Sequence, residues 1–553
     1  MKRTRGKKGR ILGSAVDRKA LAEVRDLLAN EPRTRDMLIE HLHKIQDRYH
    51  HISSRHILSL AMEMNLPRAE VYETATFYHH FDVIKENETP TPPLTIRVCN
   101  SLTCEMFGAG QLLDELISGN NTDVRIQTVP CVGRCNKAPL AIVGSYPVET
   151  ANKAKVNRAI FNKETECALP ECITYAQYRK DGGYQTLIDC INGKHQPESI
   201  IKLLEDSNLR GLGGAGFPVG RKWRILREQP QPRLIAINID EGEPGTFKDR
   251  YYLERDPHRF IEGTLIAHWA IEATDIYIYI RDEYTGCRKM LERELATLRK
   301  DPPCKLPNIY LRRGAGAYIC GEESAMIESI EGKRGMPRLR PPYVAEVGLF
   351  GRPTLEQNME SMHWIRDIIE KGADWFAAEG RNGRKGLRSF SVSGRIQKPG
   401  IYLAPAGITM NELIDEFCGG MLPGHEFYGY FPGGASGGIL PASLGNVPLD
   451  FDTLQAHDCF IGSAAIIVLS DKDSAKALAL NAMRFFEHES CGQCTPCRVG
   501  TAKAVKLMEQ NDWDQLLLKD LAQAMEDASI CGLGQAAPKP LRCAMYYFPE
   551  EFE

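Results

Sequence analysis

The stretch that decides the fold is Cys491-Gly-Gln-Cys494-Thr-Pro-Cys497, completed further along by Cys531 in Ser529-Ile-Cys531-Gly-Leu-Gly. Three thiolates at this spacing and a distant fourth can enclose a cubane cluster, because short loops let them converge on one face. Zinc is the competing metal, but zinc sites usually pair two separated Cys-x2-Cys knuckles. Cysteines that are merely buried small residues would be scattered instead. The spacing therefore predicts a [4Fe–4S] cluster on Cys491, Cys494, Cys497 and Cys531.

Length and composition point to a multi-domain redox protein. A chain of 553 residues is too long for one core. The net charge of −3 gives no electrostatic case for nucleic acid. No apolar run approaches the ~18 residues that a membrane helix needs, and the N-terminus lacks a secretory core. We therefore expect a cytoplasmic protein, in which 17 cysteines argue for metal or redox chemistry rather than disulfides.

Residues 1–17 form a basic segment, for which we expect a solvated tail, with docking on an acidic partner subunit as the alternative. The apolar spacing of Leu21, Val24 and Leu28 predicts helices from 18 onward, in a bundle that extends to 90. The bundle is rich in histidines, but none is spaced around an acid as in a zincin motif. We expect most of them to be surface or capping residues.

Two strands, predicted at 94–99 and 124–129, each lead into a cysteine pair. The pairs are Cys99 with Cys104, and Cys131 with Cys135. Four thiolates in two pairs suit a [2Fe–2S] cluster or a structural zinc, and the three residues inside the second pair favour iron–sulfur. A helical bundle followed by this pattern resembles the thioredoxin-like 24-kDa-type subunit of complex I, over about 20–165. The resemblance implies a [2Fe–2S] centre on all four cysteines.

A glycine-rich stretch, Asn208-Leu-Arg-Gly-Leu-Gly-Gly-Ala-Gly-Phe217, follows a connector whose cysteines lack paired spacing. The segment before the glycines looks helical, whereas a dinucleotide fingerprint requires a strand there, which weakens a plain Rossmann interpretation. Bare backbone and a following helix start still suit a phosphate, with Lys222 close in sequence. A strand predicted at 234–239 delivers polar side chains where it ends, which suit ribityl or ribose hydroxyls. A solvated acidic turn is the alternative.

A second glycine-rich loop is Gly314-Ala-Gly-Ala-Tyr-Ile-Cys-Gly-Glu-Glu323, whose two acids would ordinarily cap a helix. Together these motifs closely resemble the flavin- and NADH-binding 51-kDa-type subunit of complex I, over roughly 200–545. The resemblance implies FMN on Gly211, Gly213, Gly214, Lys222, Asn238, Asp240, Glu241, Tyr318, Gly321, Glu322 and Asn358. It implies NAD(H) near Phe217, Glu243, Glu323, Arg340 and Tyr343, with Glu243 and Glu323 orienting the nucleotide. No side-chain nucleophile is required.

This sequence departs from that pattern at five positions. Relatives often have Lys, Phe, Arg, Ala and Asn where this chain has Arg340, Tyr343, Leu212, Ile239 and Gln357. We expect these changes to affect the nucleotide contacts more than the flavin site.

Beyond the flavin region, residues 386–470 alternate predicted strands (389–392, 459–462 and 464–469) with one helix at 410–417. A β-grasp module fits this pattern. Cys459 has no paired thiolate nearby in sequence, so we expect no ligand role for it. Gly433-Gly-Ala-Ser-Gly-Gly438 lacks a following Lys-Ser/Thr, which predicts a turn rather than a phosphate loop.

The expected fold is a multi-domain α/β chain. Its predicted parts are a basic tail (1–17), an N-terminal helical bundle (18–90), a thioredoxin-like [2Fe–2S] domain (91–165), a connector (166–199), a Rossmann-like FMN/NAD domain (200–385), a β-grasp, soluble-ligand-binding-like domain (386–472) and a helical [4Fe–4S] domain (473–553).

The cofactors imply a diaphorase, because FMN can exchange hydrides with NAD and single electrons with clusters. All four thiolates of the first module are present, and 529–538 and 431–441 look most like diaphorase subunits of formate dehydrogenases. We therefore predict the β subunit of an NAD-dependent formate dehydrogenase. Its partner would be a molybdenum- or tungsten-containing α subunit with further iron–sulfur clusters. The alternatives are a diaphorase of NAD-reducing hydrogenase, a fused NADH-dehydrogenase module of complex I, and, outside enzymes, a zinc-stabilised scaffold.

Overall fold

A computed structural model describes residues 17–85, 87–119 and 123–553. The basic segment 1–16 lies outside the described residues, so the tail expected there is not addressed. The chain divides into two compact units, Met1–Thr91 with Gly332–Arg334, and Pro92–Glu331 with Gly335–Glu553. Among the described residues, no helix has the length and apolarity that crossing a membrane demands.

The first unit is helical, as predicted. Asp17 begins its first helix by accepting a hydrogen bond from the Lys19 N–H, and Val24 and Leu28 are buried on one face. The elements are α1 (Arg18–Leu28), α2 (Leu38–Tyr49), β1 (Ile52–Ser53), α3 (Ser54–Glu63), α4 (Arg68–Phe77) and β2 (Val83–Ile84).

Three of the seven histidines in this unit are core residues rather than surface or capping residues. His41, His43 and His56 are at most 2% exposed. They lie on the core faces of α2 and α3, because each falls at the helical spacing of the apolar residues beside it. Burial lowers the pKa of His41 and of His56.

The second unit begins with a four-stranded sheet in the order β4-β3-β5-β6, and both strands predicted here are present. β3 and β4 run parallel, so both cysteine pairs follow the same edge of the sheet. The elements are β3 (Leu94–Cys99), α5 (Leu102–Met106), α6 (Ala109–Ile117), β4 (Val124–Val129), β5 (Ala141–Val143), β6 (Tyr146–Val148) and α7 (Lys153–Phe161).

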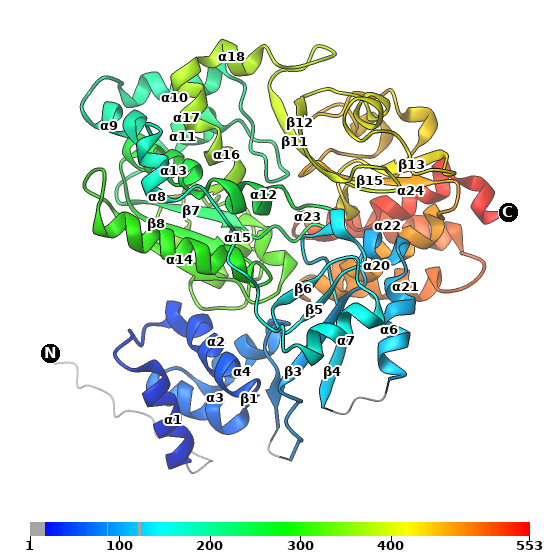
Figure 1. The fold of residues 1–553 in the computed structure, drawn as a ribbon, viewed down its shortest axis with the longest axis horizontal. Coiled ribbons are helices and arrows are strands. Elements are labelled where there is room, and N and C mark those ends of the chain that lie inside the picture. The colour runs from blue at the N-terminus through cyan, green and yellow to red at the C-terminus, as the bar shows by residue number, and fades with distance from the viewer. Residues whose placement is uncertain (1–16, 86, 120–122) are drawn as a thin grey trace, which may run out of the picture. The chain divides into compact units, whose positions relative to one another are not determined.

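A parallel sheet in the order β10-β7-β8-β9 forms the middle of the second unit. Figure 1 shows α13 and α14 on opposite sides of this sheet. The two central strands, β7 and β8, are buried on both faces over most of their length, which explains their continuous apolar sequences. The elements are α8 (Tyr175–Lys180), α9 (Gln185–Ile191), α10 (Pro197–Asp206), α11 (Val219–Arg227), β7 (Arg233–Ile239), α12 (Lys248–Arg255), α13 (Pro257–Ile271), β8 (Ala273–Ile280), α14 (Thr285–Lys300), β9 (Asn308–Arg313), α15 (Glu323–Ile330), β10 (Thr354–Asn358), α16 (Met359–His363), α17 (Ile365–Lys371) and α18 (Ala373–Ala377).

The connector is folded onto this middle part. Glu262 of α13 accepts hydrogen bonds from the Tyr178 hydroxyl (2.6 Å) and the Tyr184 N–H (2.9 Å). The Tyr184 hydroxyl contacts His258 Nδ1 at 2.8 Å. Because all these groups are buried, the network fixes α8 and α9 against the β10-β7-β8-β9 sheet.

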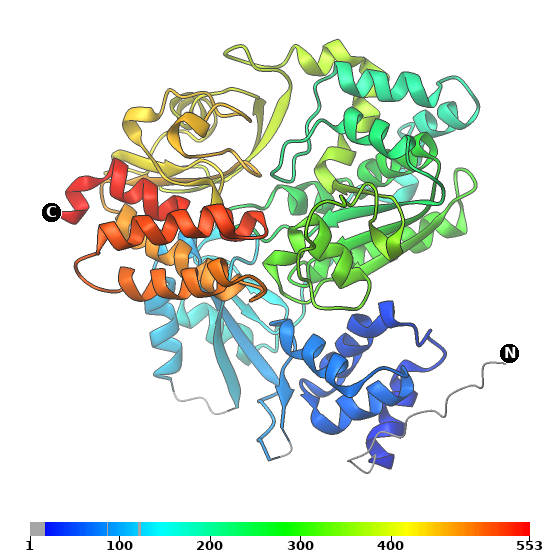
Figure 2. The ribbon, with the colours of Figure 1, turned by 180° about the vertical axis from the view of Figure 1, so that it is seen from behind.

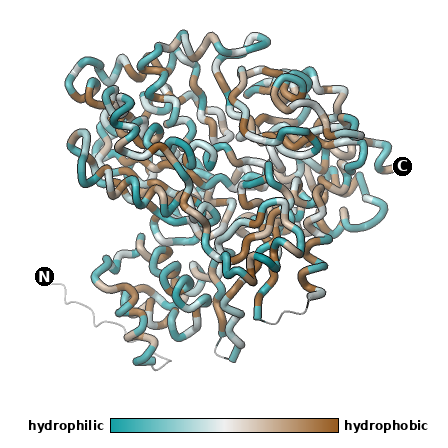
Figure 3. The backbone as a smooth tube through the Cα atoms, in the orientation of Figure 1, coloured by the Kyte–Doolittle hydropathy of each residue, from teal (hydrophilic) through white to brown (hydrophobic). Residues whose placement is uncertain are grey.

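A five-stranded sheet in the order β12-β11-β15-β13-β14 follows. β11 and β15 are parallel and the other pairs antiparallel, and β15 is buried along its whole length. Hydrophobic stretches run through the interior of the second unit, whereas its outer loops are mostly hydrophilic (Figure 3). The elements are β11 (Leu387–Gly394), β12 (Gly400–Pro405), α19 (Met410–Glu412) with a π turn (Leu413–Phe417), β13 (Phe427–Phe431), β14 (Leu440–Pro441) and β15 (Ala465–Ser470).

One strand prediction in this sheet was wrong. Residues 459–462 form an irregular loop rather than a strand. Its backbone is tied instead to the glycine-rich turn, since the Phe460 N–H donates to the Gly437 carbonyl at 3.1 Å. The apolar side chains that suggested a strand are buried by loop packing.

The C-terminal part is a helical bundle, whose helices lie beside the five-stranded sheet when seen from behind (Figure 2). It consists of α20 (Ala475–Glu489), α21 (Thr495–Met508), α22 (Gln515–Ala528), α23 (Gly532–Ala536) and α24 (Lys539–Tyr547).

Candidate functional site

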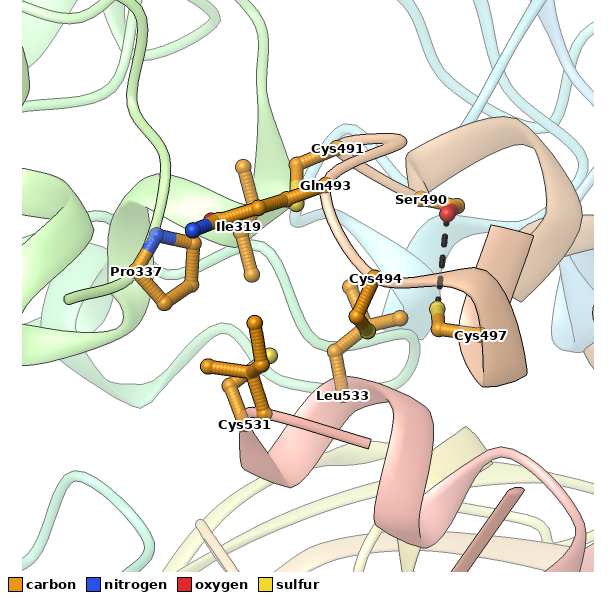
Figure 4. Close-up of a pocket in the computed structure, with 10 residues that line it drawn as sticks. Ile319, Pro337, Ser490, Cys491, Gln493, Cys494, Cys497, Cys531 and Leu533 are labelled. Atoms are coloured by element: carbon orange, nitrogen blue, oxygen red, sulfur yellow. Dashed lines mark hydrogen bonds between the residues drawn. The ribbon is translucent and has the colours of Figure 1, made fainter. Parts of the chain in front are cut away.

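The four cysteines of the C-terminal motif surround one small cavity. Cys491 and Cys494 lie on the loop between α20 and α21, Cys497 lies in the first turn of α21, and Cys531 precedes α23. Figure 4 shows their side chains around a shared space, whose wall includes Ile319. Burial raises the pKa of Cys497 to about 12 and that of Cys531 to about 11. A cationic metal centre would offset this cost and hold the sulfurs as thiolates, so the residues fit a cluster.

The second glycine-rich loop forms one wall of this cavity. Ile319 lies in the 3₁₀ turn Tyr318–Gly321. The Tyr318 N–H donates to Glu489 Oε2 at 2.9 Å, and the Tyr318 and Phe485 rings lie 5.0 Å apart between centroids. Glu489 ends α20 just before the cysteine motif. The turn that holds two predicted flavin residues is therefore bonded to the helix that leads into the cysteines.

The first glycine-rich loop connects α10 to α11, so a helix precedes it, as the sequence indicated. A Cβ on Gly213 would lie 3.0 Å from Asn358 Cβ, and one on Gly216 would lie 2.6 Å from the Phe451 ring. Gly216 also has a φ of +66°. Gly216 therefore requires glycine, and at Gly213 a side chain would fit only if Asn358 shifted. Gly213 thus keeps bare backbone beside Asn358, which caps the start of α16, where an anion is favoured.

Polar side chains converge at the carboxyl edge of the parallel sheet. Asn238 and Asn358 end adjacent strands and are partners in register. The Asn238 amide donates to the Gly321 carbonyl and to Glu356 Oε1, both at 3.0 Å, which brings the second glycine-rich loop to the same edge. This edge is the usual ligand position of an open α/β sheet.

Asp240 places a buried carboxylate oxygen at this edge. Its Oδ2 atom has no hydrogen bond within the described part of the chain. Burial raises the pKa of Asp240 well above its usual range. A buried acceptor of this kind suits a ligand hydroxyl, which is the chemistry of a ribityl chain.

Lys222 of α11 supplies a positive charge at the same edge. Its Nζ lies 3.1 Å from Glu356 Oε2 and 3.7 Å from Glu323 Oε2. Burial favours the neutral amine, but the two carboxylates outweigh it and raise the pKa of Lys222. The side chain is therefore a retained cation, which suits a phosphate.

The residues predicted to contact NAD(H) lie partly together. Glu323 Oε1 is 3.2 Å from a guanidinium nitrogen of Arg340 and so joins the Lys222 cluster. Phe217 and Tyr343 are 40% and 54% exposed, so a ligand could reach both side chains. Arg221 lies over the Phe217 ring at 5.6 Å.

Glu243 lies between the β10-β7-β8-β9 sheet and the module of the five-stranded sheet. It accepts hydrogen bonds from the Tyr318 hydroxyl and from the Ser436 N–H, the latter at 2.8 Å. Burial raises the pKa of Glu243 to about 7 despite these donors. Its charge therefore changes near neutrality.

Two predicted flavin ligands have side chains that the fold already uses. Glu241 accepts hydrogen bonds from the N–H groups that begin α12 and from the Tyr284 hydroxyl at 2.7 Å. Glu322 caps α15 by accepting from the Ser324 and Ala325 N–H groups, both at 3.0 Å. Both carboxylates stabilise helix starts at the edge of the site, so their side chains are engaged by internal donors.

The first cysteine set is also gathered in one place. Its four members are at most 6% exposed, and the sulfurs of Cys131 and Cys135 lie 3.2 Å apart. The pKa of Cys131 is lowered to about 6 by a hydrogen bond from Cys135, the Gly245 N–H and the charge of Arg281. A thiolate is thus favoured at Cys131, and the donor set fits a [2Fe–2S] cluster.

One guanidinium group joins this cysteine loop to the carboxyl edge of the β10-β7-β8-β9 sheet. Arg281 donates to the Cys131 carbonyl at 2.7 Å and also to the Glu241 carbonyl. The Gly133 carbonyl accepts from Arg250 Nε at 2.9 Å. Both cysteine sets therefore pack directly against segments that border the predicted flavin site.

Sequence reasoning missed several residues of this site. Glu356 partners both Lys222 and Asn238, and Gln357, noted only as a departure, has a buried Oε1 without a hydrogen-bond partner among the described residues. Ser436 and Phe451 come from the five-stranded module. Glu356 and Gln357 could have been found from their place on the strand that ends at Asn358, whereas the other two carry no local signal.

Comparisons with known proteins match three parts of the chain. Residues 24–164 match the thioredoxin-like [2Fe-2S] ferredoxin family, 204–367 the Nuo51 FMN-binding domain, and 477–553 the NADH-ubiquinone oxidoreductase-F iron-sulfur binding region. The second NADH-quinone oxidoreductase F protein of Rhizobium meliloti (strain 1021) is 39% identical over 401 residues, which cover 69% of this chain and 94% of that one. The NADH-quinone oxidoreductase F protein of Aquifex aeolicus (strain VF5) is 40% identical over 400 residues, covering 69% and 92%.

Solved structures are similar over nearly the whole chain. A chain of the NAD+-reducing [NiFe]-hydrogenase in the air-oxidized state has a TM-score of 0.82 and 29% identity, and the match covers 95% of this chain and 94% of that one.

Fold, site and family matches together define an NAD-dependent oxidoreductase module that carries FMN, a [2Fe–2S] cluster and a [4Fe–4S] cluster. These matches favour iron–sulfur over zinc in both cysteine-containing parts. More particularly, the chain belongs to the family of NADH-quinone oxidoreductase F proteins, with the 24-kDa-type and 51-kDa-type parts fused in one polypeptide.

Proposed function

We propose that this chain moves electrons between NAD(H) and iron–sulfur clusters through FMN held at the carboxyl edge of the β10-β7-β8-β9 sheet. One observation carries the proposal. The turn Tyr318–Gly321 borders the flavin edge through the Asn238–Gly321 hydrogen bond, and its Ile319 lines the four-cysteine cavity. The same backbone segment thus separates the flavin site from the cluster site.

Each residue set has a distinct role in this proposal. Gly211, Gly213, Gly214 and Lys222 would receive the phosphate, while Asn238, Asp240 and Asn358 would hold the hydroxyl-bearing chain. When bound, FMN supplies the exchange between hydride transfer and single-electron transfer. Glu243 and Glu323 would orient the nucleotide. Cys491, Cys494, Cys497 and Cys531 would hold [4Fe–4S], and Cys99, Cys104, Cys131 and Cys135 would hold [2Fe–2S].

Metal analysis tests the cluster assignments. We expect iron and acid-labile sulfide in the amounts that one cluster of each kind requires, with a visible absorption spectrum. A colourless protein with stoichiometric zinc would contradict the proposal.

We further propose that the chain is the NAD-reactive β subunit of a cytoplasmic formate dehydrogenase, with a molybdenum- or tungsten-containing α subunit as its partner. Three features support this: the four-thiol first module, residues 431–441 and residues 529–538. Formate would be oxidised on the partner, and its electrons would reach NAD+ through this chain, reversibly with CO2.

A second candidate is the diaphorase of an NAD-reducing hydrogenase. The match to the hydrogenase chain over 95% of this sequence supports it. Purification of the intact complex separates the two. NAD+ reduction by formate, with molybdenum or tungsten in the complex, supports the first candidate, whereas reduction by H2, with nickel in the complex, supports the second.

A further inference from the structure

Two buried cysteines outside both cluster sites lie side by side. Cys459, in the loop before β15, and Cys543, in α24, have sulfur atoms 3.6 Å apart. Both side chains are 2% exposed. The spacing of cysteines in the sequence did not reveal this contact, because the two residues are 84 positions apart.

The glycine-rich turn 433–438 covers this pair. A Cβ on Gly438 would lie 2.5 Å from the Cys459 sulfur and 3.0 Å from the Cys543 sulfur, and Gly438 has a φ of +85°. The turn is thus fitted to the two sulfurs by the absence of a side chain.

The other end of the same turn contacts Glu243. The Ser436 N–H donates to Glu243 Oε1 at 2.8 Å. A Cβ on Gly434 would lie 2.7 Å from that oxygen. A displacement of the turn at Gly438 would therefore have only a few residues to cross before it reached Glu243, which also accepts a hydrogen bond from the Tyr318 hydroxyl.

Small molecules can approach Cys459 from a cavity of about 350 Å³, which Gly214, Asp458, Cys459 and Lys539 help to line. Gly214 belongs to the first glycine-rich loop, so the cavity extends from that loop to Cys459. This is more than enough room for a molecule the size of a hydroperoxide.

We propose that Cys459 and Cys543 form a redox modification site, which a hydroperoxide oxidises to a disulfide that shifts the 433–438 turn against Glu243. The Cys459 sulfur attacks one peroxide oxygen and the O–O bond breaks. The thiol proton leaves with the other oxygen as water, and Cys459 becomes a sulfenic acid. The Cys543 sulfur then attacks the sulfenic sulfur, the S–S bond forms and a second water leaves. The two thiols lose two electrons and two protons, and the hydrogen peroxide gains both.

Bond formation must move the turn or the helix. The sulfurs approach from 3.6 Å to the disulfide distance of about 2 Å. Because interiors are closely packed, the atoms around Gly438 must follow this contraction. We expect the oxidised form to oxidise NADH roughly tenfold more slowly, since small misplacements of orienting groups have effects of that size. This rate effect rests on the orienting role proposed for Glu243, whereas the disulfide itself does not.

The test uses the intact holoenzyme, treated with a few equivalents of hydrogen peroxide and then alkylated and mapped by peptide mass spectrometry. We expect a linked Cys459–Cys543 peptide, slower NADH oxidation with an artificial acceptor, and recovery of both with dithiothreitol. Iron and sulfide content are measured in parallel, so that cluster loss is recognised. The variants Cys459→Ser and Cys543→Ser should each resist the reversible loss.

Cys418→Ser is the matched control, because Cys418 is a buried thiol of the same module whose pKa is raised by burial alone. It should respond like the wild type. Absence of the linked peptide while the clusters stay intact would overturn the site. A linked peptide without a change in rate would overturn its coupling to Glu243, as would a reversible loss that persists in both serine variants.

Discussion

At the scale of single residues, the carboxylates at the flavin edge fall into two kinds. Glu241 and Glu322 receive hydrogen bonds from helix starts inside the chain. Asp240 is equally enclosed, yet one of its oxygens has no donor among the described residues. Because an unsatisfied buried acceptor is costly, a ligand at this edge would satisfy Asp240, as it would Gln357, whose Oε1 also lacks a partner among the described residues.

Replacing Asp240 tests this distinction. For Asp240→Ala we expect FMN to bind roughly 10- to 100-fold more weakly, the equivalent of about 1–3 kcal/mol for a lost buried hydrogen bond. Fluorescence titration of the deflavinated protein measures the affinity. The control is Asp206→Ala, which removes an exposed carboxylate on α10 and should leave FMN binding normal. Equal affinity of the Asp240 variant and the wild type would remove Asp240 from the site.

Glu243 should make stability depend on pH near neutrality. Its pKa of about 7 in the fold exceeds the ordinary 4.5, so the neutral carboxyl is favoured by folding. The resulting stabilisation is complete below 4.5 and is lost as pH rises through about 7.

We therefore expect the melting temperature of Glu243→Gln, measured relative to that of the wild type at the same pH, to rise by a few degrees between about pH 5.5 and about pH 8. Thermal melts of the deflavinated proteins at both values provide the measurement. A difference between the two proteins that does not change with pH would show that Glu243 titrates normally.

At the scale of elements, the flavin edge is assembled from loops that belong to different modules. Phe451 packs against the first glycine-rich loop at Gly216. The guanidinium carbons of Arg210 and Arg388 lie 4.7 and 3.9 Å from the centroid of the Phe451 ring. Gly216 can approach this ring only because it has no side chain.

Gly216→Ala should therefore displace the loop. A positive φ and a Cβ 2.6 Å from the ring together cost about 2–5 kcal/mol, and we expect most of the FMN to be lost on purification. Gly372→Ala is the control, since Gly372 has a φ of +94° but open space around it, and it should lose stability without losing FMN. The flavin content of both purified proteins is the measurement. Full flavin in the Gly216 variant would contradict a rigid loop.

Local pattern predicted most elements but not how the loops meet. The strands at 94–99, 124–129 and 234–239 follow from apolar runs, and the helix before the first glycine-rich loop follows from its spacing. The spacing of the cysteines also predicted both cysteine sets, because the first consists of two close pairs and three of the four cysteines in the C-terminal motif are near neighbours. The contact of Cys459 with Cys543, and the loop at 459–462 that resembled a strand, depend on packing between distant segments. No periodicity carries that information.

At the scale of the whole molecule, the second unit places one flavin edge against two cysteine sets. Arg281 joins the edge to the Cys131 loop, and the turn Tyr318–Gly321 joins it to the Cys491 motif. Under the proposed function, FMN bound at this edge would be the obligatory link between NADH and the clusters.

Removal of FMN should therefore abolish NADH oxidation by the isolated chain with an artificial acceptor, and added FMN should restore it. The clusters should survive this treatment, as judged by iron content. Normal activity in the flavin-free protein would contradict the link.

The most direct test of the central claim is anaerobic reduction with NADH, followed by electron paramagnetic resonance of the wild type and Cys494→Ala in the intact complex. In the wild type we predict a reduced [4Fe–4S] signal and electron exchange with the partner subunit. In Cys494→Ala we predict that FMN is still bound and bleached by NADH, while the [4Fe–4S] signal and turnover with the partner are lost. Undiminished partner turnover in Cys494→Ala would show that the four-cysteine site is not the relay.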